Sequence, residues 1–252
     1  MTVHVSHAGD VATVTVDRPH KANALDSATM DAFAAALRTL SEDASLRAVI
    51  VTGAGTRSFI AGADVTEMAT LGPATARAFI TRVHHCCAAV RDCPAPVIAR
   101  IGGACFGAGL ELAAACDLRL AADHAIFGMP EVRLGIPSVV EAALLPLLVG
   151  WGRTRHMLLL GGTFPAADAL AWGLLEQVVP VAELDAATAA WIDSLRQATP
   201  AALRAQKALI RRWEDLPLRA AIAAGIDAFA DAYHTPEPAA AMQAFHPRRG
   251  PA

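Results

Sequence analysis

The sequence predicts an α/β protein in which strands alternate with helices and the C-terminal third is helical. The 252 residues are 54% hydrophobic and 18% charged, a composition that excludes a disordered chain. Short apolar runs bounded by glycine or polar residues recur through the first half, as expected of buried strands. From Ser138 onward the spacing of apolar residues is helical almost throughout.

The N-terminal segments predict a strand, a helix and a second strand. Residues 11–16 alternate in a strand pattern that Pro19 closes. We expect Ser27 to cap the helix that follows. The apolar face of this helix comprises Met30, Phe33, Leu37 and Leu40. Residues 48–51 form a continuous apolar run, typical of a buried strand.

The central segments continue this alternation around a glycine-rich turn. The expected elements are a helix over 75–91, a strand over 97–101, a helix over 109–116 and short strands over 118–121 and 125–127. The glycine-rich turn occupies residues 102–109, between the strand and the helix. Beyond Ser138, only residues 177–179 interrupt the helical pattern. Pro200 and Pro217 mark helix starts, so we divide the chain into a core over 1–198 and a helical region over 199–252.

Charge, cysteines and hydropathy exclude several functional classes. Lys and Arg total 21 against 24 Asp and Glu, so a nucleic-acid role has little electrostatic support. Five irregularly spaced cysteines indicate reduced thiols in the cytoplasm rather than a disulfide scaffold. The most apolar stretch, residues 136–150, is broken by prolines and a glutamate, and the N-terminus lacks a signal-peptide core. We therefore expect a soluble protein.

Several motif-like segments do not support a cofactor or a metal. The glycine-rich run over 102–109 lacks the Lys-Ser/Thr of a phosphate-binding loop, and Ser58 replaces the third glycine after Gly53 and Gly55. No Gly-x-Ser-x-Gly or His-Glu-x-x-His motif is present. The run His84-His85-Cys86-Cys87 cannot converge on one ion, because adjacent helical residues point in different directions. A helix with free thiols on its buried side is the better explanation of this run.

The segment from residue 97 to residue 111 predicts an anion-binding turn beside a carboxylate. Backbone N–H groups of the turn and the following helix N-terminus suit a developing oxyanion. Glu111 lies in the first turn of that helix, and Glu131 follows it by twenty positions. A pair of carboxylates near such a turn permits general acid/base chemistry. Spacing alone does not exclude the alternatives, in which Glu111 only stabilises the helix and Glu131 is a solvated carboxylate in a loop.

Several segments resemble the crotonase, or enoyl-CoA hydratase/isomerase, superfamily, in family order over nearly the whole chain. The matching segments are Arg-Pro-His-Lys-Ala-Asn-Ala-Leu at 18–25, Ser-Phe-Ile-Ala-Gly-Ala-Asp-Val at 58–65, the run from Gly103 to Ala113 with Cys116-Asp117, Phe-Gly-Met-Pro-Glu at 127–131 with Leu-Gly-Ile-Pro at 134–137, Gly161-Gly162, and Ala-Trp-Gly-Leu-Leu at 171–175. The resemblance implies a crotonase-like (ClpP/crotonase) spiral of β-β-α turns. It also implies a helical C-terminal region, 199–252, for trimerisation or as a lid, in a homotrimer or a dimer of trimers.

The resemblance also implies a binding site for an acyl-CoA thioester, with CoA part of the substrate and no other cofactor. Ala63 and Ala108 occupy the two oxyanion-hole positions, where a backbone N–H typically contributes about 3 kcal/mol. The implied CoA and substrate contacts are Ala22, Ala24, Arg57, Ala61, Gly62, Asp64, Val65, Gly107, Gly109, Pro130, Leu134 and Arg248. For Arg57 and Arg248 a plain surface charge is an equal alternative.

Glu111 and Glu131 match both catalytic glutamates of the family's hydratases, whereas its isomerases generally use one, at the position of Glu131. We therefore expect water to be added across the trans-2 double bond of an enoyl-CoA, with Glu111 as base and Glu131 as acid. The alternative is enoyl-CoA isomerisation or other thioester-enolate chemistry, including thioester hydrolysis. RNA binding, known in some family members, is disfavoured by the charge balance, and a non-catalytic subunit is disfavoured by the intact glutamate pair.

The sequence departs from the family pattern in one segment and at two further positions. Hydratases usually have glycines after the Ile-Pro pair, but residues 138–143 read Ser-Val-Val-Glu-Ala-Ala, which predicts an immediate helix. Glu141 adds a third carboxylate that could line the site. Ala108 replaces the customary glycine, and Thr66 stands where some members have a phosphate-binding lysine. These changes affect the expected reaction more than the expected CoA ligand.

Overall fold

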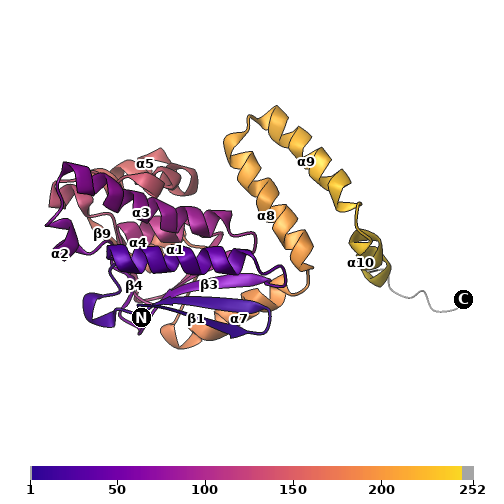
Figure 1. The fold of residues 1–252 in the computed structure, drawn as a ribbon, viewed down its shortest axis with the longest axis horizontal. Coiled ribbons are helices and arrows are strands. Elements are labelled where there is room, and N and C mark those ends of the chain that lie inside the picture. The colour runs from indigo at the N-terminus through magenta and orange to yellow at the C-terminus, as the bar shows by residue number, and fades with distance from the viewer. Residues whose placement is uncertain (1, 246–252) are drawn as a thin grey trace, which may run out of the picture. The chain divides into compact units, whose positions relative to one another are not determined.

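The computed structural model describes residues 2–245 and divides into two compact units, residues 1–197 and 198–252 (Figure 1). The first unit is an α/β core, and the second consists of helices. The division falls one residue before the boundary predicted from Pro200. Arg248 lies outside the described residues.

A six-stranded sheet forms the frame of the first unit. Its strands, in spatial order, are β1 (Val3–Ala8), β2 (Val11–Val16), β3 (Ala48–Gly53), β5 (Val97–Ile101), β7 (Leu118–Ala122) and β10 (Gln177–Val179). The hairpin β1–β2 is antiparallel, and every later pairing in this sheet is parallel. The strands expected from continuous apolar runs are therefore confirmed.

Helices cover both faces of this sheet (Figure 1). One face packs against α1 (Ser27–Ser41) and α3 (Pro73–Asp92), and the other against α7 (Leu184–Leu195). Helix α1 buries the predicted stripe of apolar residues. Its N-cap, however, is Asp26, whose carboxylate accepts from the N–H of Thr29 at 2.8 Å, and not the expected Ser27. Ser27 is instead the first helical residue.

A smaller sheet of four very short strands lies beside the frame. It has the order β4 (Ser58–Ile60), β6 (Ala104–Phe106), β8 (Ile126–Gly128) and β9 (Thr163–Pro165). Strands β4, β6 and β8 run parallel, and β9 pairs antiparallel to β8. The sequence predicted only β8 of these four, because strands of three residues show too little periodicity to detect.

The connecting helices of the first unit follow the strand ends. They are η1 (Pro19–Lys21), α2 (Val65–Met68), α4 (Ala108–Ala115), η2 (Glu131–Leu134), η3 (Val140–Leu144), α5 (Leu145–Leu160), α6 (Ala166–Ala171) and η4 (Val181–Glu183). The prediction of an immediate helix at 138–143 is wrong about where the helix begins. Ser138 and Val139 are not helical, and Val139 has an extended backbone before a 3-10 helix begins at Val140.

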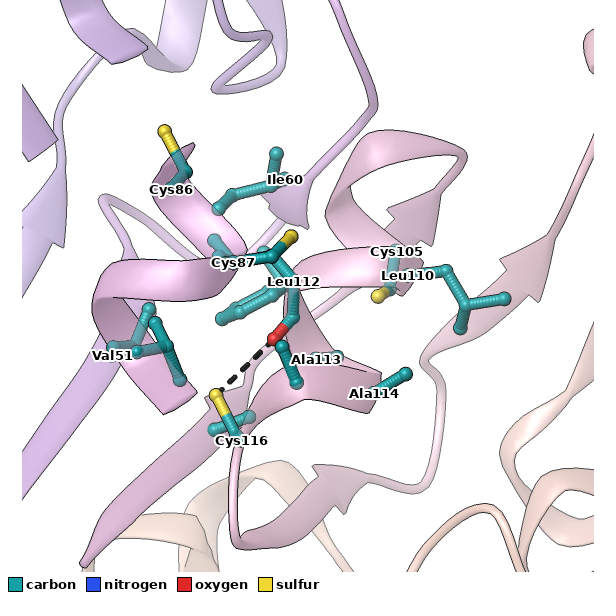
Figure 2. Close-up of a cluster of buried hydrophobic side chains, with 14 of the residues drawn as sticks. Val51, Ile60, Cys86, Cys87, Cys105, Leu110, Leu112, Ala113, Ala114 and Cys116 are labelled. Atoms are coloured by element: carbon teal, nitrogen blue, oxygen red, sulfur yellow. Dashed lines mark hydrogen bonds between the residues drawn. The ribbon is translucent and has the colours of Figure 1, made fainter. Parts of the chain in front are cut away.

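Helix α4 lies at the centre of the core, and all eight of its residues are buried. Cysteine side chains fill the space around it (Figure 2). Cys86 and Cys87 project from α3, Cys105 from β6, and Cys116 follows α4, where its thiol donates to the carbonyl of Leu112 at 3.3 Å. All five cysteines are free and buried. Burial raises the pKa of Cys86 to about 12 and that of Cys87 and Cys105 well above the usual range.

The second unit contains α8 (Pro200–Asp215), α9 (Leu218–Ala232) and α10 (Glu237–Phe245). Thr199 caps α8, and Pro200 is its first residue, as the sequence predicts. Trp213 joins α8 to α9 through a hydrogen bond from its indole Nε1 to the carbonyl of Ala221 at 2.9 Å. In the part of the chain that is described, no helix combines the length and hydropathy that a membrane span requires.

Candidate active site

Three site segments leave the small sheet at one edge. Strands β4, β6 and β8 are parallel, so the segments after them, 61–64, 107–111 and 129–131, emerge together. The backbones are in close contact there. A β-carbon placed on Gly107 would lie 3.9 Å from the Cα of Gly62, and one placed on Gly62 would lie 3.3 Å from the carbonyl oxygen of Phe106. The fold thus brings together segments that are far apart in sequence.

The two backbone N–H groups predicted for the oxyanion hole are both positioned to donate. Ala63 forms a parallel bridge with Leu25, in which Leu25 N–H donates to Gly62 at 2.9 Å and Asp64 N–H donates to Leu25 at 2.8 Å. This pattern directs the N–H of Ala63 away from Leu25. Ala108 is the first residue of α4, where N–H groups have no acceptor within the helix. The positive end of the helix dipole adds to its attraction for an anion.

Buried polar contacts fix the segment that carries Ala63. The guanidinium of Arg18 donates to Asp64 Oδ2 at 3.0 Å, pairs with Asp26 at 2.8 Å, and also donates to the carbonyl of Ala24. Asp64 caps α2 by accepting from the N–H groups of Thr66 and Glu67. Burial alone would raise the pKa of Asp64, but these hydrogen bonds outweigh it and lower the pKa. The carboxylate of Asp64 is therefore occupied by hydrogen bonds from the protein itself.

Asn23 fixes the same region from the opposite side. Its side-chain amide donates to the carbonyls of Ala54 and Ser58 at 3.0 Å each, and its Oδ1 accepts from the N–H of Arg18. Asn23 is fully buried and, like Ala22, has a positive φ. Asparagine tolerates this conformation better than most residues. The motif at 18–25 therefore organises the loop around Ala61 and Gly62.

Glu111 is a buried carboxyl group at the centre of the site. It is 3% exposed and lies in the first turn of α4. Burial, with the negative fields of Glu131 and Glu141, raises its pKa to about 8, although the backbone N–H groups of Val139 and Ala142 bond to it and oppose the rise. Glu111 is therefore mostly protonated at neutral pH.

Glu131 lies at the start of η2 and approaches the glycine-rich turn. A β-carbon placed on Gly107 would lie 2.3 Å from Glu131 Oε1, so the carboxyl group packs directly on that backbone. Gly107 has a φ of +50°, which favours glycine. The Ser138 hydroxyl donates to the other oxygen, Oε2, at 2.7 Å. The negative field of Glu131 is one cause of the raised pKa of Glu111, and the role of the two carboxyl groups as a catalytic pair stays a prediction.

Glu141 lies beside this pair. It is 8% exposed, and its Oε1 lies 2.7 Å from Nδ1 of His84 on α3. Its element, η3, packs against α4, the helix that carries Glu111, and the negative field of Glu141 contributes to the raised pKa of Glu111. The sequence raised Glu141 as a third carboxylate, but it gave no sign of the contact with His84, which lies 57 positions away. Ser138 was likewise seen only as part of an altered loop.

Most of the other predicted contact residues lie around this edge with different exposures. Arg57 does not, because it precedes β4 and lies beside Gly103 at the opposite end of that strand. Gly107 and Gly109 are buried, and the backbone at Gly109 packs so closely on β4 that a β-carbon would lie 2.0 Å from the carbonyl oxygen of Ile60. Val65 and Leu134 are 58% and 54% exposed. The remaining positions are the exposed Arg57 and the partly exposed Ala22, Ala24, Ala61 and Pro130. Within residues 2–245, no group of His, Cys, Asp or Glu side chains is arranged to hold a metal ion.

Comparison with known proteins places this architecture in a family. The sequence pattern of the enoyl-CoA hydratase/isomerase family matches residues 6–252. The chain belongs to the enoyl-CoA hydratase/isomerase family. It is 34% identical over 242 residues to the short-chain-enoyl-CoA hydratase of Clostridium acetobutylicum, covering 96% of this chain and 93% of that protein. It is 32% identical over 255 residues to carnitinyl-CoA dehydratase of Salmonella typhi, covering 99% and 97%.

Solved structures of this family share the whole fold. The chain superimposes on an enoyl-CoA hydratase from Mycobacterium smegmatis with a TM-score of 0.95 and 31% identity, over 100% of this chain and 98% of that chain. An enoyl-CoA hydratase from Bacillus anthracis gives a TM-score of 0.94 at 31% identity, with the same coverage. The predicted crotonase-like fold with a helical C-terminal region is therefore confirmed.

Proposed function

We propose that this enzyme hydrates the trans-2 double bond of an enoyl-CoA thioester with the Glu111–Glu131 pair. The observation that carries the proposal is that Glu131 packs on the backbone of Gly107, the N-cap of the helix that carries Glu111, and that the field of Glu131 contributes to the raised pKa of Glu111. Two carboxyl groups that influence each other in this way supply one acid and one base. Relatives named as a hydratase and a dehydratase support the same class of reaction.

In this proposal the thioester oxygen binds between the N–H groups of Ala63 and Ala108. Attack at Cβ moves the electrons of the double bond toward the thioester, so negative charge develops on that oxygen. Two fixed donors then stabilise the enolate more than the ground state, which lowers the barrier. The pairing of Leu25 with residues 62–64 and the buried contacts of Arg18 hold the Ala63 donor in place.

The glutamate pair must carry one proton in total. Glu111 takes a proton from water as the oxygen bonds to Cβ, and Glu131 gives a proton to Cα. The products are a 3-hydroxyacyl-CoA, a protonated Glu111 and an ionised Glu131. This final state agrees with the raised pKa of Glu111 in the free protein. The proton returns to Glu131 before the next turnover, and the apparent pKa values belong to the pair.

Product analysis with a short trans-2-enoyl-CoA tests this proposal. The wild-type protein should form the 3-hydroxyacyl-CoA, and Glu111→Gln and Glu131→Gln should each lower kcat by about 10²-fold or more. Glu42→Gln, an exposed glutamate after α1, is the matched control and should leave kcat unchanged. Absence of hydration by a folded wild-type protein that binds the thioester would contradict the proposal.

A second candidate function is supported by the segment after Pro137. It forms the 3-10 helix η3, which brings the carboxylate of Glu141 toward Glu111. A third carboxylate would also suit isomerisation or hydrolysis of the thioester through an enolate. The same assay separates these reactions, because isomerisation moves the double bond and hydrolysis releases free CoA, whereas hydration removes the conjugated alkene.

We further propose that the enzyme is a homotrimer or a dimer of such trimers. Helix α9 leaves large apolar side chains exposed on its surface, and such faces are typically covered by a partner. These residues are Leu218, Ile222, Ile226, Phe229 and Tyr233. Sedimentation equilibrium should give three or six chains, and Ile226→Asp with Phe229→Asp should shift the protein toward the monomer. A monodisperse wild-type monomer would contradict this part of the proposal.

A further inference from the structure

Glu141 is a buried carboxylate that the proposed reaction does not use. Its Oε1 bonds to His84, but its Oε2 is buried and has no hydrogen-bond partner among the described residues. Burying a carboxyl group costs free energy when one of its two oxygens accepts no hydrogen bond. A nonpolar residue would avoid this cost, so a role for Glu141 in the site has a physical basis.

The contact between Glu141 and His84 joins two different elements of the core. His84 lies on α3 with its side chain 52% exposed, whereas the Glu141 side chain on η3 is 9% exposed. The Nδ1–Oε1 distance of 2.7 Å corresponds to a short, well-formed hydrogen bond. Because η3 packs against both α3 and α4, this contact anchors η3 from the side of α3.

The anchored segment also supplies the donors that hold Glu111. The backbone N–H groups of Val139 and Ala142, which flank Glu141, bond to the Glu111 carboxyl group. A displacement of η3 would therefore remove these donors and move the charge of Glu141 at the same time. One short segment controls both the hydrogen bonding and the electrostatic surroundings of the proposed base.

The ionisable neighbours of Glu111 come from each element packed around α4. Helix η2 contributes Glu131 and η3 contributes Glu141. Helix α3 contributes Cys87, whose thiol is kept neutral by burial, and His84, which reaches the site through Glu141. Strand β6 contributes the neutral, buried thiol of Cys105, and the packed strand β4 has no ionisable side chain. Glu141 is therefore one of two acidic groups in this shell.

We propose that Glu141, held by His84, is a positioning residue that fixes the Val139 and Ala142 donors on Glu111 and keeps a second negative charge beside it. This inference rests on the proposed function in one respect, since Glu111 matters for turnover only if it reacts. Its effect on Glu111 itself can be measured without substrate. The expected consequence is a higher proton affinity of Glu111, which favours the protonated Glu111 that forms when water adds to the substrate.

Titration of the free protein by carbon NMR tests the charge of Glu141 directly. Glutamate side chains are labelled at the carboxyl carbon, and the Glu111 signal is assigned by its loss in Glu111→Gln. Glu141→Gln removes the charge, but its side-chain amide can still hydrogen-bond to His84 and keep the Val139 and Ala142 donors in place. It should therefore move the Glu111 midpoint to lower pH by about one unit, whereas Glu141→Asp, which keeps the charge, should retain most of the wild-type midpoint. The matched control His85→Ala, on the neighbouring exposed histidine, should leave it unchanged. An unchanged midpoint in folded Glu141→Gln would overturn the inference.

Hydrogen exchange tests the anchor. His84→Leu should raise exchange at the Val139 and Ala142 amides at least about tenfold, because η3 loses its contact with α3. Unchanged exchange would overturn the anchoring role. Both readouts are independent of catalysis, so a shifted midpoint in a protein without hydratase activity would contradict the proposed function and leave this inference standing.

Discussion

A β-carbon on Gly107 would lie 2.3 Å from Oε1 of Glu131, a separation that no stable contact allows. Gly107→Ala should therefore push the carboxyl group from its position and lower kcat/KM by about 100-fold, as expected for a misplacement of about 1 Å. Gly55→Ala is a matched control, since Gly55 also has a positive φ but its β-carbon would meet nothing within 4 Å. Equal losses in the two variants would assign the effect to backbone strain rather than to Glu131.

The pH dependence of turnover follows from the shared proton. The pair is active with one proton, and Glu111, with a pKa of about 8, loses that proton on the alkaline side. We expect kcat/KM to fall tenfold per unit as pH rises above about 8. Initial rates across pH 5–10 measure this, and an alkaline plateau without a decline would show that no proton is needed.

The free energy of unfolding should depend on pH through the same group, Glu111, and the direction of the change follows from its raised pKa. Burial raises the pKa of Glu111 from 4.5 to about 8, so its contribution to stability is present below about pH 4.5 and is lost as pH rises through 8. Glu111→Gln should therefore stabilise the fold above pH 8, by roughly 5 kcal/mol, and have little effect near pH 4.5. Urea unfolding at both pH values tests this, with a pH-independent difference as the contradicting result.

Removal of Arg18 should weaken both the fold and the site. Its guanidinium and the Asp64 carboxylate are both about nine-tenths buried, so Arg18→Ala leaves an uncompensated charge and should cost about 3–5 kcal/mol. Arg82→Ala breaks an exposed pair with Asp31 and should cost about 0.5 kcal/mol or less. Chemical denaturation compares them directly. Similar losses of stability in the two variants would mean that burial does not determine the strength of the Arg18 contact.

The buried thiols should be inert in the folded protein. Burial raises the pKa of Cys86 to about 12 and raises that of Cys87 and Cys105 well above the usual range, so little reactive thiolate forms at pH 8. A disulfide reagent such as DTNB should modify the five thiols at the rate of unfolding in water and within seconds in 6 M guanidinium. Fast labelling of the native protein would contradict the packing shown in Figure 2.

The large-scale fold was predictable because its strands carry strong local patterns. Residues 11–16, 48–51 and 97–101 are continuous apolar or alternating runs, and each became a strand of the large sheet. Strands β4, β6 and β9 were not predictable, because pairing between distant segments creates them rather than local sequence preference. The cap of α1 moved from Ser27 to Asp26 because neighbouring polar residues can both serve and geometry chooses between them.

The candidate site was likewise predictable only in part from the sequence. Glu111 and Glu131 followed from matched motifs, and the proximity of the segments that carry them became visible only when β6 and β8 were paired. The partnership of His84 with Glu141 has no signal in sequence, because a helix and a 3-10 turn converge through tertiary packing. In the run from His84 to Cys87, the two cysteines line the core, whereas His84 is half-exposed and turns toward η3.

The three parallel strands that precede the site segments are each only three residues long. Their positions are set by main-chain pairing and by glycines that allow close backbone approach, not by the identity of the reacting side chains. Exchange of a carboxyl group at this edge should therefore leave the framework intact while altering the chemistry that it supports. This separation makes the scaffold suitable for laboratory redesign, in which new reactions on CoA thioesters are sought by replacing side chains at residues 111 and 131 alone.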